Sequence, residues 1–210
     1  MNEKFITFEG GEGAGKTSVI QQLSQILQDE NVDFITTREP GGIKISESIR
    51  HIILDTNNKE MDGRTEALLY AAARRQHLVE RVIPALELGK IVLCDRFLDS
   101  SLVYQGIARR LGLEEVYAIN SFAIENSLPK LTFYFDIEPE KGLARIAQNK
   151  EREINRLDQE NLEFHYKVRE GYLKLLEMFP ERIIKINADR PLEEVVDETK
   201  EKLFSYLNIK

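Results

Sequence analysis

A chain of 210 residues, 42% of them hydrophobic, is long enough to bury one substantial core, and its length favours one domain, spanning residues 1–210, over two. The formal charge of -7 argues against a surface that follows a nucleic-acid backbone, because such surfaces concentrate Lys and Arg. The single cysteine, Cys94, cannot form an internal disulfide. The first residues lack the apolar run of a secretory leader, and no segment reaches the ~20 apolar residues of a membrane span. We therefore expect a soluble protein of the reducing cytoplasm that binds neither nucleic acid nor membrane.

Short runs of β-branched and aromatic residues alternate with longer segments of helical periodicity along the whole chain. This alternation is typical of a parallel β-sheet covered by helices. The predicted strands occupy residues 4–9, 33–38, 90–94, 131–136 and 182–187. The expected fold class is therefore α/β, with a five-stranded parallel sheet and helices on both faces.

Four helical segments follow these strands in chain order. The first is marked by apolar residues that repeat at three- and four-residue steps: Val19, Ile20, Leu23, Ile26 and Leu27. A second helix is predicted to begin at Ser46. Residues 65–88 are rich in Ala, Leu, Glu and Arg and predict a long helix, which Pro84 kinks or shortens by its last turn. An apolar stripe after Pro191 predicts a closing helix that docks on the core.

A charged segment between Lys141 and Lys167 departs from this regularity. Its basic residues include Arg145, Lys150, Arg152 and Arg156. A solvated helical face accounts for most charge runs of this kind, and composition alone does not distinguish such a face from a functional segment.

The strongest motif is a phosphate-binding loop, because Gly10, Gly15, Lys16 and Thr17 match G-x-x-x-x-G-K-[ST] between a predicted strand and a predicted helix. Glycines allow backbone N–H groups to turn around a polyphosphate, and the helix N-terminus adds partial positive charge. We expect Lys16 to reach the outer phosphates of ATP and the Thr17 hydroxyl to ligate Mg²⁺. The predicted ATP-binding residues are Gly10, Gly11, Glu12, Gly13, Ala14, Gly15, Lys16, Thr17 and Ser18.

The run IVLCD, residues 91–95, ends an apolar strand with an acid. Carboxylates at this position complete the magnesium shell in phosphate-loop proteins. Alone the pattern is weak, since an Asp often starts the turn after a strand. Together with the phosphate-binding loop it makes Asp95, beside Arg96, the predicted second metal ligand, while Cys94 is expected to pack within the strand.

Five ordered motifs occur over nearly the whole chain: FEGGEGAGKTS at 8–18, TREPGG at 37–42, RTEALLYAAARRQH at 64–77, DRFLDSSLVYQG at 95–106 and NRLDQE at 155–160. In this combination the chain resembles bacterial thymidylate kinases. The resemblance implies a three-layer P-loop NTPase fold with a small lid at about residues 141–162. It also implies a homodimeric enzyme that uses ATP and Mg²⁺ to phosphorylate dTMP to dTDP in dTTP synthesis.

A kinase that joins two anionic substrates needs cations around the acceptor phosphate. Arg38 and Arg96 each follow a predicted strand, and ligands of parallel sheets bind at those carboxyl ends. The resemblance implies that both contact the acceptor phosphate and that Arg50 does so too. The alternative for each single Arg is a surface salt bridge.

Tyr70 and Arg74 lie four residues apart on the long predicted helix and therefore project from the same face. That face can stack a pyrimidine and bond its edge. The resemblance assigns these tasks to the pair, although the family commonly has Phe where Tyr70 stands. Packing in the core is the alternative for Tyr70.

If Asp99 caps a helix, Ser101, Tyr104 and Gln105 lie at positions i, i+3 and i+4 and point the same way. The resemblance assigns Ser101 and Gln105 to the edge of the base. It places Tyr104 beside the sugar, where the ring leaves little room for a 2′-hydroxyl. Capping and packing of the helix is the alternative.

The phosphate-binding loop contains no Arg, and the resemblance implies that a lid supplies the catalytic cation instead. Arg156 is the first candidate, and Arg145 and Arg152 are the second. Glu12 is expected near the sugar of the substrate or a metal-bound water. The predicted catalytic residues are Lys16, Arg38, Arg96 and Arg156, and Arg145 is added to the ATP-binding set.

Two rival functions remain open from the residues alone. A deoxynucleoside kinase would need a carboxylate base near the phosphate-binding loop, for which Glu9 and Glu12 are available. A P-loop ATPase switch would hydrolyse ATP without a nucleotide acceptor. The TREPGG motif and the acceptor arginines favour the monophosphate kinase, which needs no general base because its acceptor is already an anionic oxygen.

Overall fold

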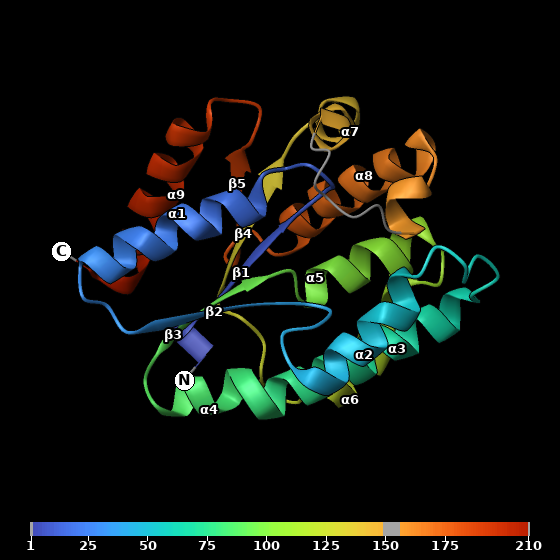
Figure 1. Ribbon diagram of the computed structural model, residues 1–210, viewed down its shortest axis with the longest axis horizontal. Coiled ribbons are helices and arrows are strands. Elements are labelled where there is room, and N and C mark those ends of the chain that lie inside the picture. The colour runs from blue at the N-terminus through green and yellow to red at the C-terminus, as the bar shows by residue number, and fades with distance from the viewer. Residues whose placement is uncertain (1, 149–155, 210) are drawn as a thin grey trace.

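The computed structural model describes residues 2–148 and 156–209. Five strands form one parallel sheet in the order β2-β3-β1-β4-β5 (Figure 1). The strands are β1 (Phe5–Gly10), β2 (Phe34–Arg38), β3 (Ile91–Asp95), β4 (Leu131–Asp136) and β5 (Ile183–Asn187). The five-stranded parallel sheet predicted from the sequence is confirmed, and each predicted strand boundary lies within one residue of the observed one. All residues of β1 and β4 are buried, as expected for central strands covered on both faces.

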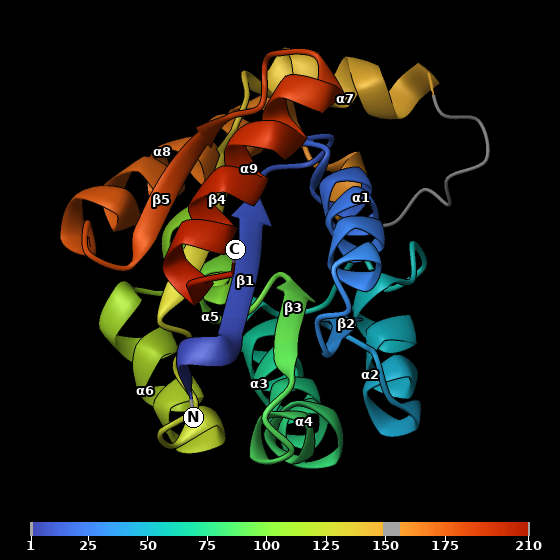
Figure 2. The same ribbon diagram turned by 90° about the vertical axis from the view of Figure 1, so that its left-hand side faces the viewer.

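The helices α1 (Lys16–Asp29) and α9 (Leu192–Leu207) lie side by side on one face of the sheet (Figures 1 and 2). Their apolar stripes meet alternate residues of the central strands, including Ile6, Phe8 and Phe133, which are fully buried. This layer fixes the start of α1, and with it the loop that precedes Lys16, against the end of β1.

The opposite face is covered by a second group of helices (Figure 1). They are α3 (Gly63–His77), η2 (Leu78–Val82), α4 (Ile83–Glu87), α5 (Leu98–Ser101), η3 (Leu102–Ala108), α6 (Leu113–Ile124) and α8 (Leu162–Met178). The long helix predicted over residues 65–88 is thus two α-helices, α3 and α4, joined by the π-helical segment η2. Pro84 lies in the first turn of α4, where a missing backbone N–H costs little.

The remaining helices flank these layers. The helix α2 (Lys44–Leu54) packs on α3 and begins two residues before the predicted Ser46. Short 3₁₀ turns occur at η1 (Asn2–Lys4) and η4 (Arg156–Gln159). The charged segment contains α7 (Pro139–Gln148) and η4, whereas Lys150 and Arg152 lie outside the described residues.

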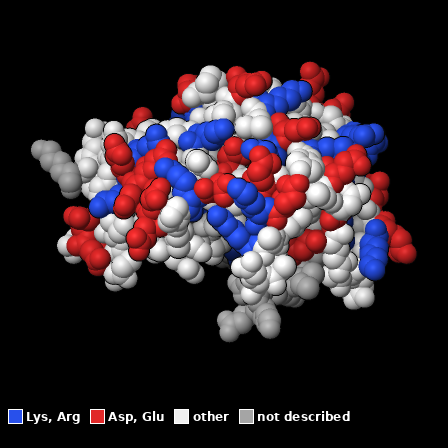
Figure 3. Space-filling model, turned by 90° about the horizontal axis from the view of Figure 1, so that it is seen from above, with Lys and Arg blue, Asp and Glu red and all other residues white. Residues whose placement is uncertain are grey.

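The surface mixes charges of both signs. Figure 3 shows Lys and Arg side chains interspersed with Asp and Glu side chains over the face seen from above. Within residues 2–148 and 156–209, no helix has the length and apolar character needed to cross a membrane.

The carboxyl ends of three neighbouring strands meet at one edge of the sheet. Asp95 at the end of β3 pairs in register with Phe8 of β1 and with Arg38 at the end of β2. The Arg96 backbone N–H then donates to the Phe8 carbonyl at 3.0 Å, which holds the chain after β3 against β1. The loops that follow these strands therefore converge, as ligand-binding loops do in open parallel sheets.

Candidate functional site

A cavity of about 460 Å³ lies where these loops converge. Residues 12–18 of the phosphate-binding loop form part of its wall, while the carbonyl oxygens of Gly10 and Gly11 lie behind them and accept from Lys16. The cavity also brings together the predicted metal, acceptor and base residues: Arg38, Arg50, Tyr70, Arg74, Asp95, Arg96, Ser101, Tyr104, Gln105 and Arg145. One predicted catalytic residue, Arg156, does not belong to the wall.

The phosphate-binding loop requires glycine for steric reasons. Gly13 and Gly15 have φ angles of 70° and 83°, in the left-handed region. A Cβ atom at Gly13 would lie 2.0 Å from the carbonyl oxygen of Gly142 in α7. The loop is therefore held between α1 and α7 at a distance that only glycine permits.

Lys16 is buried within this loop and donates from Nζ to the carbonyl oxygens of Gly10 and Gly11, each at 3.0 Å. Burial and the neighbouring Arg96 lower the pKa of Lys16 to about 8. A desolvated ammonium group next to a second cation is stabilised by an anion. The wall of the cavity at Lys16 is thus suited to a polyphosphate.

Thr17 and Asp95 form the pair predicted for the metal. The Thr17 hydroxyl donates to Asp95 Oδ2 at 2.9 Å. The buried Oδ1 atom of Asp95 has no hydrogen-bond partner among the described residues. A hydroxyl and a carboxylate are oxygen ligands of the kind that Mg²⁺ prefers, so the residues present fit this ion. In the described part of the chain no group of three His, Cys, Asp or Glu forms a metal site.

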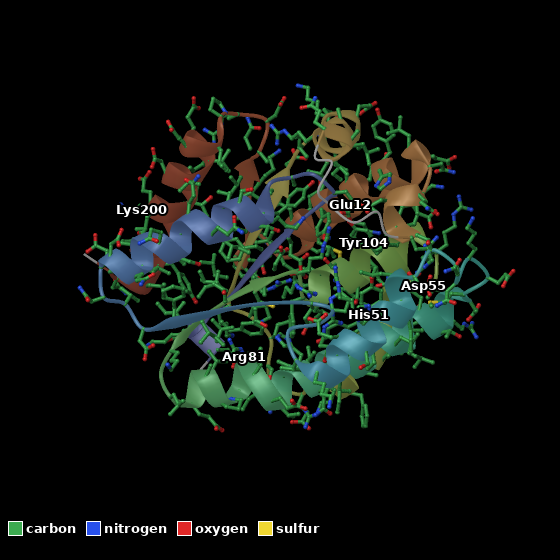
Figure 4. All side chains as sticks on the ribbon, viewed as in Figure 1. Glu12, His51, Asp55, Arg81, Tyr104 and Lys200 are labelled. Atoms are coloured by element: carbon green, nitrogen blue, oxygen red, sulfur yellow. The ribbon has the colours of Figure 1, made fainter. Side chains whose placement is uncertain are left out.

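Arg96 borders the cavity and has a left-handed φ of 66°. Its guanidinium group donates to Glu12 Oε1 at 2.8 Å and to the Tyr104 hydroxyl at 3.2 Å. The Tyr104 hydroxyl in turn donates to Glu12 Oε1 at 3.0 Å, and Figure 4 shows the two side chains close together. Burial alone would lower the pKa of Arg96, but Glu12 and nearby hydroxyls hold it well above its ordinary value. Arg96 is therefore a permanent, oriented cation.

Two more arginines meet at the carbonyl oxygen of Pro40. Arg38 donates to it at 2.8 Å and Arg50 at 3.1 Å. Burial and repulsion by Arg38 lower the pKa of Arg50. Arg38 also forms a salt bridge of 2.8 Å with Glu47. The alternative of a surface salt bridge, which the sequence left open for each arginine, therefore describes one of the contacts of Arg38. Even so, the cluster is richer in cations than in anions, and a phosphate group would relieve the repulsion.

Arg74 is fixed from several sides and is only 2% exposed. Nε donates to Glu39 Oε2 at 2.7 Å, and Nη1 donates to the Ser101 hydroxyl at 3.1 Å and to Asn120. The other Glu39 oxygen lies 2.9 Å from Nδ1 of His77. Sequence reasoning missed Glu39 and His77, although both lie inside quoted motifs and His77 follows Arg74 by three residues on α3.

Tyr70 lies one helical turn before Arg74 and also borders the cavity. Burial raises the pKa of its hydroxyl, and the nearby Glu66 raises it further. The phenol therefore stays protonated at neutral pH. Its ring and the Arg74 guanidinium group occupy the same side of α3, as predicted.

The condition that Asp99 caps a helix is not met. Phe97 occupies the position before α5, whereas Asp99 lies inside the helix and pairs with Arg182 through bonds of 2.7 and 2.8 Å. The chain then continues as the π-helix η3, whose wider turns change the side-chain directions. Tyr104 consequently bonds Glu12 while Gln105 bonds Glu66, although both border the cavity.

Arg145 and Arg156, the two described arginines of the predicted lid, lie in different places. Arg145 of α7 borders the cavity and donates to the Ala188 carbonyl at 3.1 Å. Arg156 is 7% exposed, donates from Nε to the Ile53 carbonyl at 2.9 Å and pairs with Glu66. Its expected position over the phosphoryl group is therefore not what the structure has, because burial against α2 and α3 holds it elsewhere. Arg152, the other candidate, lies outside the described residues.

Glu9 is fully buried at the end of β1 and anchors the turn that carries Arg96. It accepts from the Phe97 backbone at 2.7 Å, from the Ser100 hydroxyl at 2.6 Å and from the Tyr172 hydroxyl at 2.9 Å. Burial and the neighbouring Asp99 raise its pKa to about 7. Because Glu9 does not border the cavity, it is poorly placed to act as a base toward a substrate hydroxyl.

Comparisons with known proteins agree with this geometry. The family model described as thymidylate kinase matches residues 8–199. A thymidylate kinase of Oceanobacillus iheyensis is 65% identical over 206 residues, covering 98% of this chain and 92% of that protein. One of Clostridium novyi is 61% identical over 196 residues, covering 93% and 96%. The solved structure of thymidylate kinase from Ehrlichia chaffeensis has a TM-score of 0.76 at 30% identity, covering 95% of this chain and 97% of that one.

Proposed function

This chain belongs to the thymidylate kinase family, and from that premise we propose how the cavity binds its two substrates. The chain phosphorylates dTMP to dTDP with ATP, in the synthesis of dTTP. We propose that ATP places its phosphates on residues 10–18 and that dTMP places its phosphate on Arg38, Arg50 and Arg96. The comparisons support this activity and give no support to the two rival functions, the deoxynucleoside kinase and the ATPase switch.

One observation carries the proposal. A single cavity is lined both by the phosphate-binding loop with Lys16 and by three arginines, of which Arg38 and Arg50 meet at Pro40 and Arg96 bonds Glu12 of the loop. Two groups of cations facing one space suit a reaction between two phosphorylated substrates. A hydroxyl acceptor would not need the second group.

The transfer follows from this arrangement. A phosphate oxygen of dTMP forms the new bond to the γ-phosphorus of ATP, and the bond from that phosphorus to the bridging oxygen of ADP breaks. Arg38, Arg50 and Arg96 hold the acceptor in line, while Lys16 and Arg145 neutralise charge on the ATP side. No residue has to remove a proton, because the acceptor oxygen is already anionic.

We assign the metal position to Thr17 and Asp95. Mg²⁺ bound there would neutralise charge on the ATP phosphates. The Asp95 carboxylate has one oxygen that receives no hydrogen bond from a described residue, and the adjacent hydroxyl of Thr17 points to the other. The two side chains would thereby hold the ion beside the phosphate-binding loop.

The base and sugar occupy the far end of the cavity in this proposal. Tyr70 stacks on thymine, and Arg74, Ser101 and Gln105 bond its edge. Tyr104 and Glu12 lie beside the sugar, where the tyrosine ring disfavours a 2′-hydroxyl. The hydrogen bonds that fix Arg74 support a preorganised base site, because a side chain already held in place loses little entropy on binding.

We also propose that residues 1–210 act as one catalytic domain in the cytoplasm, where ATP and dTMP are available. Residues 141–162 form its lid. Arg145 of α7 is the cation that the lid brings to ATP, and Arg156 anchors the other end of the lid to α2 and α3. The close contact between Gly13 and Gly142 supports this, because it joins the phosphate-binding loop to α7.

We further propose that the protein forms a homodimer through α3 and α6. Large apolar side chains are exposed on two helices that pack together: Leu68 of α3 is 56% exposed, and Tyr117 and Phe122 of α6 are 49% and 88% exposed. Exposed apolar side chains that cluster on neighbouring helices favour association. A second copy of the chain is the partner that the family resemblance implies.

Replacement of Arg38 tests the division of the cavity into two phosphate sites. Arg38→Ala should raise the KM for dTMP by ~10- to 100-fold, the value of one or two charged hydrogen bonds. The KM for ATP should change little. Arg81→Ala, on the exposed surface of η2, is the matched control and should change neither value (Figure 4). Equal effects of Arg38→Ala on both substrates would contradict the assignment.

A further inference from the structure

Glu66 is a buried carboxylate that the proposed reaction does not use. It lies on α3 one turn before Tyr70 and is 1% exposed. Its Oε1 accepts from Gln105 Nε2 at 2.8 Å, and its Oε2 accepts from Arg156. Arg109 approaches both oxygens, at 3.4 and 3.5 Å. Glu66 thus joins the base end of the cavity to a pair of cations behind it.

The charge of Glu66 determines the orientation of Gln105. Burial alone would raise the pKa of Glu66, but Arg109 and the hydrogen bonds from Gln105 and Arg156 lower it below the ordinary value. An ionised carboxylate accepts hydrogen bonds and cannot donate them. The Gln105 atom that faces Glu66 must therefore be the amide nitrogen.

The same orientation leaves the amide oxygen of Gln105 for a ligand. Gln105 borders the cavity, and no described residue donates to its Oε1 atom. A turn of the amide by 180° would offer hydrogen-bond donors instead, but it would set the amide oxygen against the Glu66 carboxylate. The carboxylate therefore selects one of two amide orientations.

That choice has a chemical consequence at the base. Thymine and uracil carry an N–H group at N3, whereas cytosine carries a lone pair there. An amide oxygen accepts from the N–H group and repels the lone pair, and an amide NH₂ group does the reverse. A site that leaves a buried polar group unpaired discriminates strongly against the wrong ligand.

We propose that Glu66 is a positioning residue that holds the Gln105 amide with its oxygen toward the base and thereby selects thymine over cytosine. The inference rests on the proposed function, which places Gln105 at the edge of the base. It assigns Glu66 no contact with either substrate.

Glu66→Gln is the informative change, because it keeps the shape and removes one acceptor. The single oxygen of the new side chain is drawn to Arg156 and Arg109, so its NH₂ group faces Gln105. Gln105 then turns to accept, and its own NH₂ group faces the base. The ratio of kcat/KM for dTMP to that for dCMP should fall by ~10- to 100-fold, mainly through a higher KM for dTMP, while the KM for ATP stays unchanged.

Glu160→Gln is the matched control, because Glu160 also accepts from Arg109, whereas the side-chain amide of Gln105 bonds Glu66 and not Glu160 among the described residues. It should leave the dTMP to dCMP ratio unchanged. A ratio unaltered in Glu66→Gln, or lowered equally in both variants, would overturn the role of Glu66. Gln105→Leu separates this failure from that of the proposed function: if it leaves the KM for dTMP unchanged, Gln105 does not touch the base at all.

A measurement on the native protein covers the case in which Glu66→Gln does not fold. The side-chain amide signals of Gln105 in ¹H–¹⁵N spectra, assigned by their loss in Gln105→Leu, should show hydrogens protected from solvent exchange before dTMP is added. Protection is expected because one hydrogen is bonded to buried Glu66. Rapid exchange of both hydrogens would overturn the proposal.

Discussion

The Thr17 hydroxyl donates a hydrogen bond of 2.9 Å to Asp95, which joins the first turn of α1 to the end of β3. The two residues are far apart in the sequence, and the parallel register of β1 and β3 brings them together. The second oxygen of Asp95 is buried with no hydrogen-bond partner among the described residues. This arrangement leads to a prediction about the metal.

Asp95→Asn should weaken the response of the enzyme to Mg²⁺. The amide keeps the size of the side chain but removes the charge that would face the ion. We expect a higher Mg²⁺ concentration for half-maximal ADP release and a kcat lowered by ~100-fold, the scale seen when one electrostatic contact to the transition state is lost. Removal of Mg²⁺ by a chelator should stop the native enzyme. An unaltered Mg²⁺ titration in the variant would place the ion elsewhere.

ATP binding should be linked to proton uptake at Lys16. The pKa of this residue is lowered to about 8 by burial and by Arg96, and anionic phosphates beside it would raise that value again. The free protein has therefore partly lost this proton above pH 8, and bound ATP restores it. ATP affinity should accordingly fall as the pH rises through 8. Calorimetry in two buffers of different ionisation enthalpy measures the proton directly, and binding without proton uptake at alkaline pH would refute the linkage.

Arg145 and Arg156 should differ in what their removal affects. Arg145→Ala should raise the KM for ATP and lower kcat, with little change in unfolding, because the side chain borders the cavity and bonds a single carbonyl. Arg156→Ala should lower the free energy of unfolding by about 2 kcal/mol, since it leaves Glu66 with fewer partners. Urea titrations and steady-state kinetics on both variants check this. If Arg156→Ala instead lowers kcat and leaves the free energy of unfolding unchanged, Arg156 acts on the transferred phosphoryl group and is not a structural anchor.

Glu9 should make the stability of the protein depend on pH. Burial and Asp99 raise its pKa from 4.5 to about 7, so the native state holds this proton more tightly than the unfolded state does. The contribution is fully present below pH 4.5 and is lost as the pH rises through 7. Glu9→Gln, which does not titrate, should gain on the order of 2 kcal/mol relative to the native protein between about pH 5 and pH 8. A difference that is constant with pH would contradict the shift.

The proposed dimer surface makes its own prediction. Phe122 is 88% exposed on α6, and a charge at this position would be buried unpaired in an interface. Phe122→Glu should therefore convert the dimer to a monomer in light scattering, whereas Phe122→Leu should not. A monomeric mass for the native protein in light scattering would contradict the proposed homodimer.

Local patterns explain why so much of the fold was predictable. The strands and α1 follow from apolar periodicity, and the phosphate-binding loop follows from glycine spacing with Lys16 and Thr17. These features depend on neighbours within a few residues. The positions of Arg38 and Arg96 after β2 and β3 then followed from the rule that parallel strands end at one edge.

The side-chain positions that the sequence did not predict depend on contacts between distant parts of the chain. Glu39 lies 35 residues before Arg74, and no local pattern shows that it fixes the guanidinium group. Asp99 follows a strand like a helix cap, yet buried Arg182 draws it into an ion pair. Arg156 has the charge expected of a lid residue, but Glu66 holds it against the protein. In each case a buried ion pair determined the position of the side chain.

The reaction itself is tested most directly by ADP release with MgATP against dTMP, dUMP, UMP, CMP and thymidine in turn. We expect a strong preference for dTMP, because the arginine cluster needs an acceptor phosphate and Tyr104 disfavours a 2′-hydroxyl. Preference for thymidine would show that the acceptor is a hydroxyl group, and ADP release without any acceptor would show ATP hydrolysis alone; either result would contradict the assignment as a dTMP kinase.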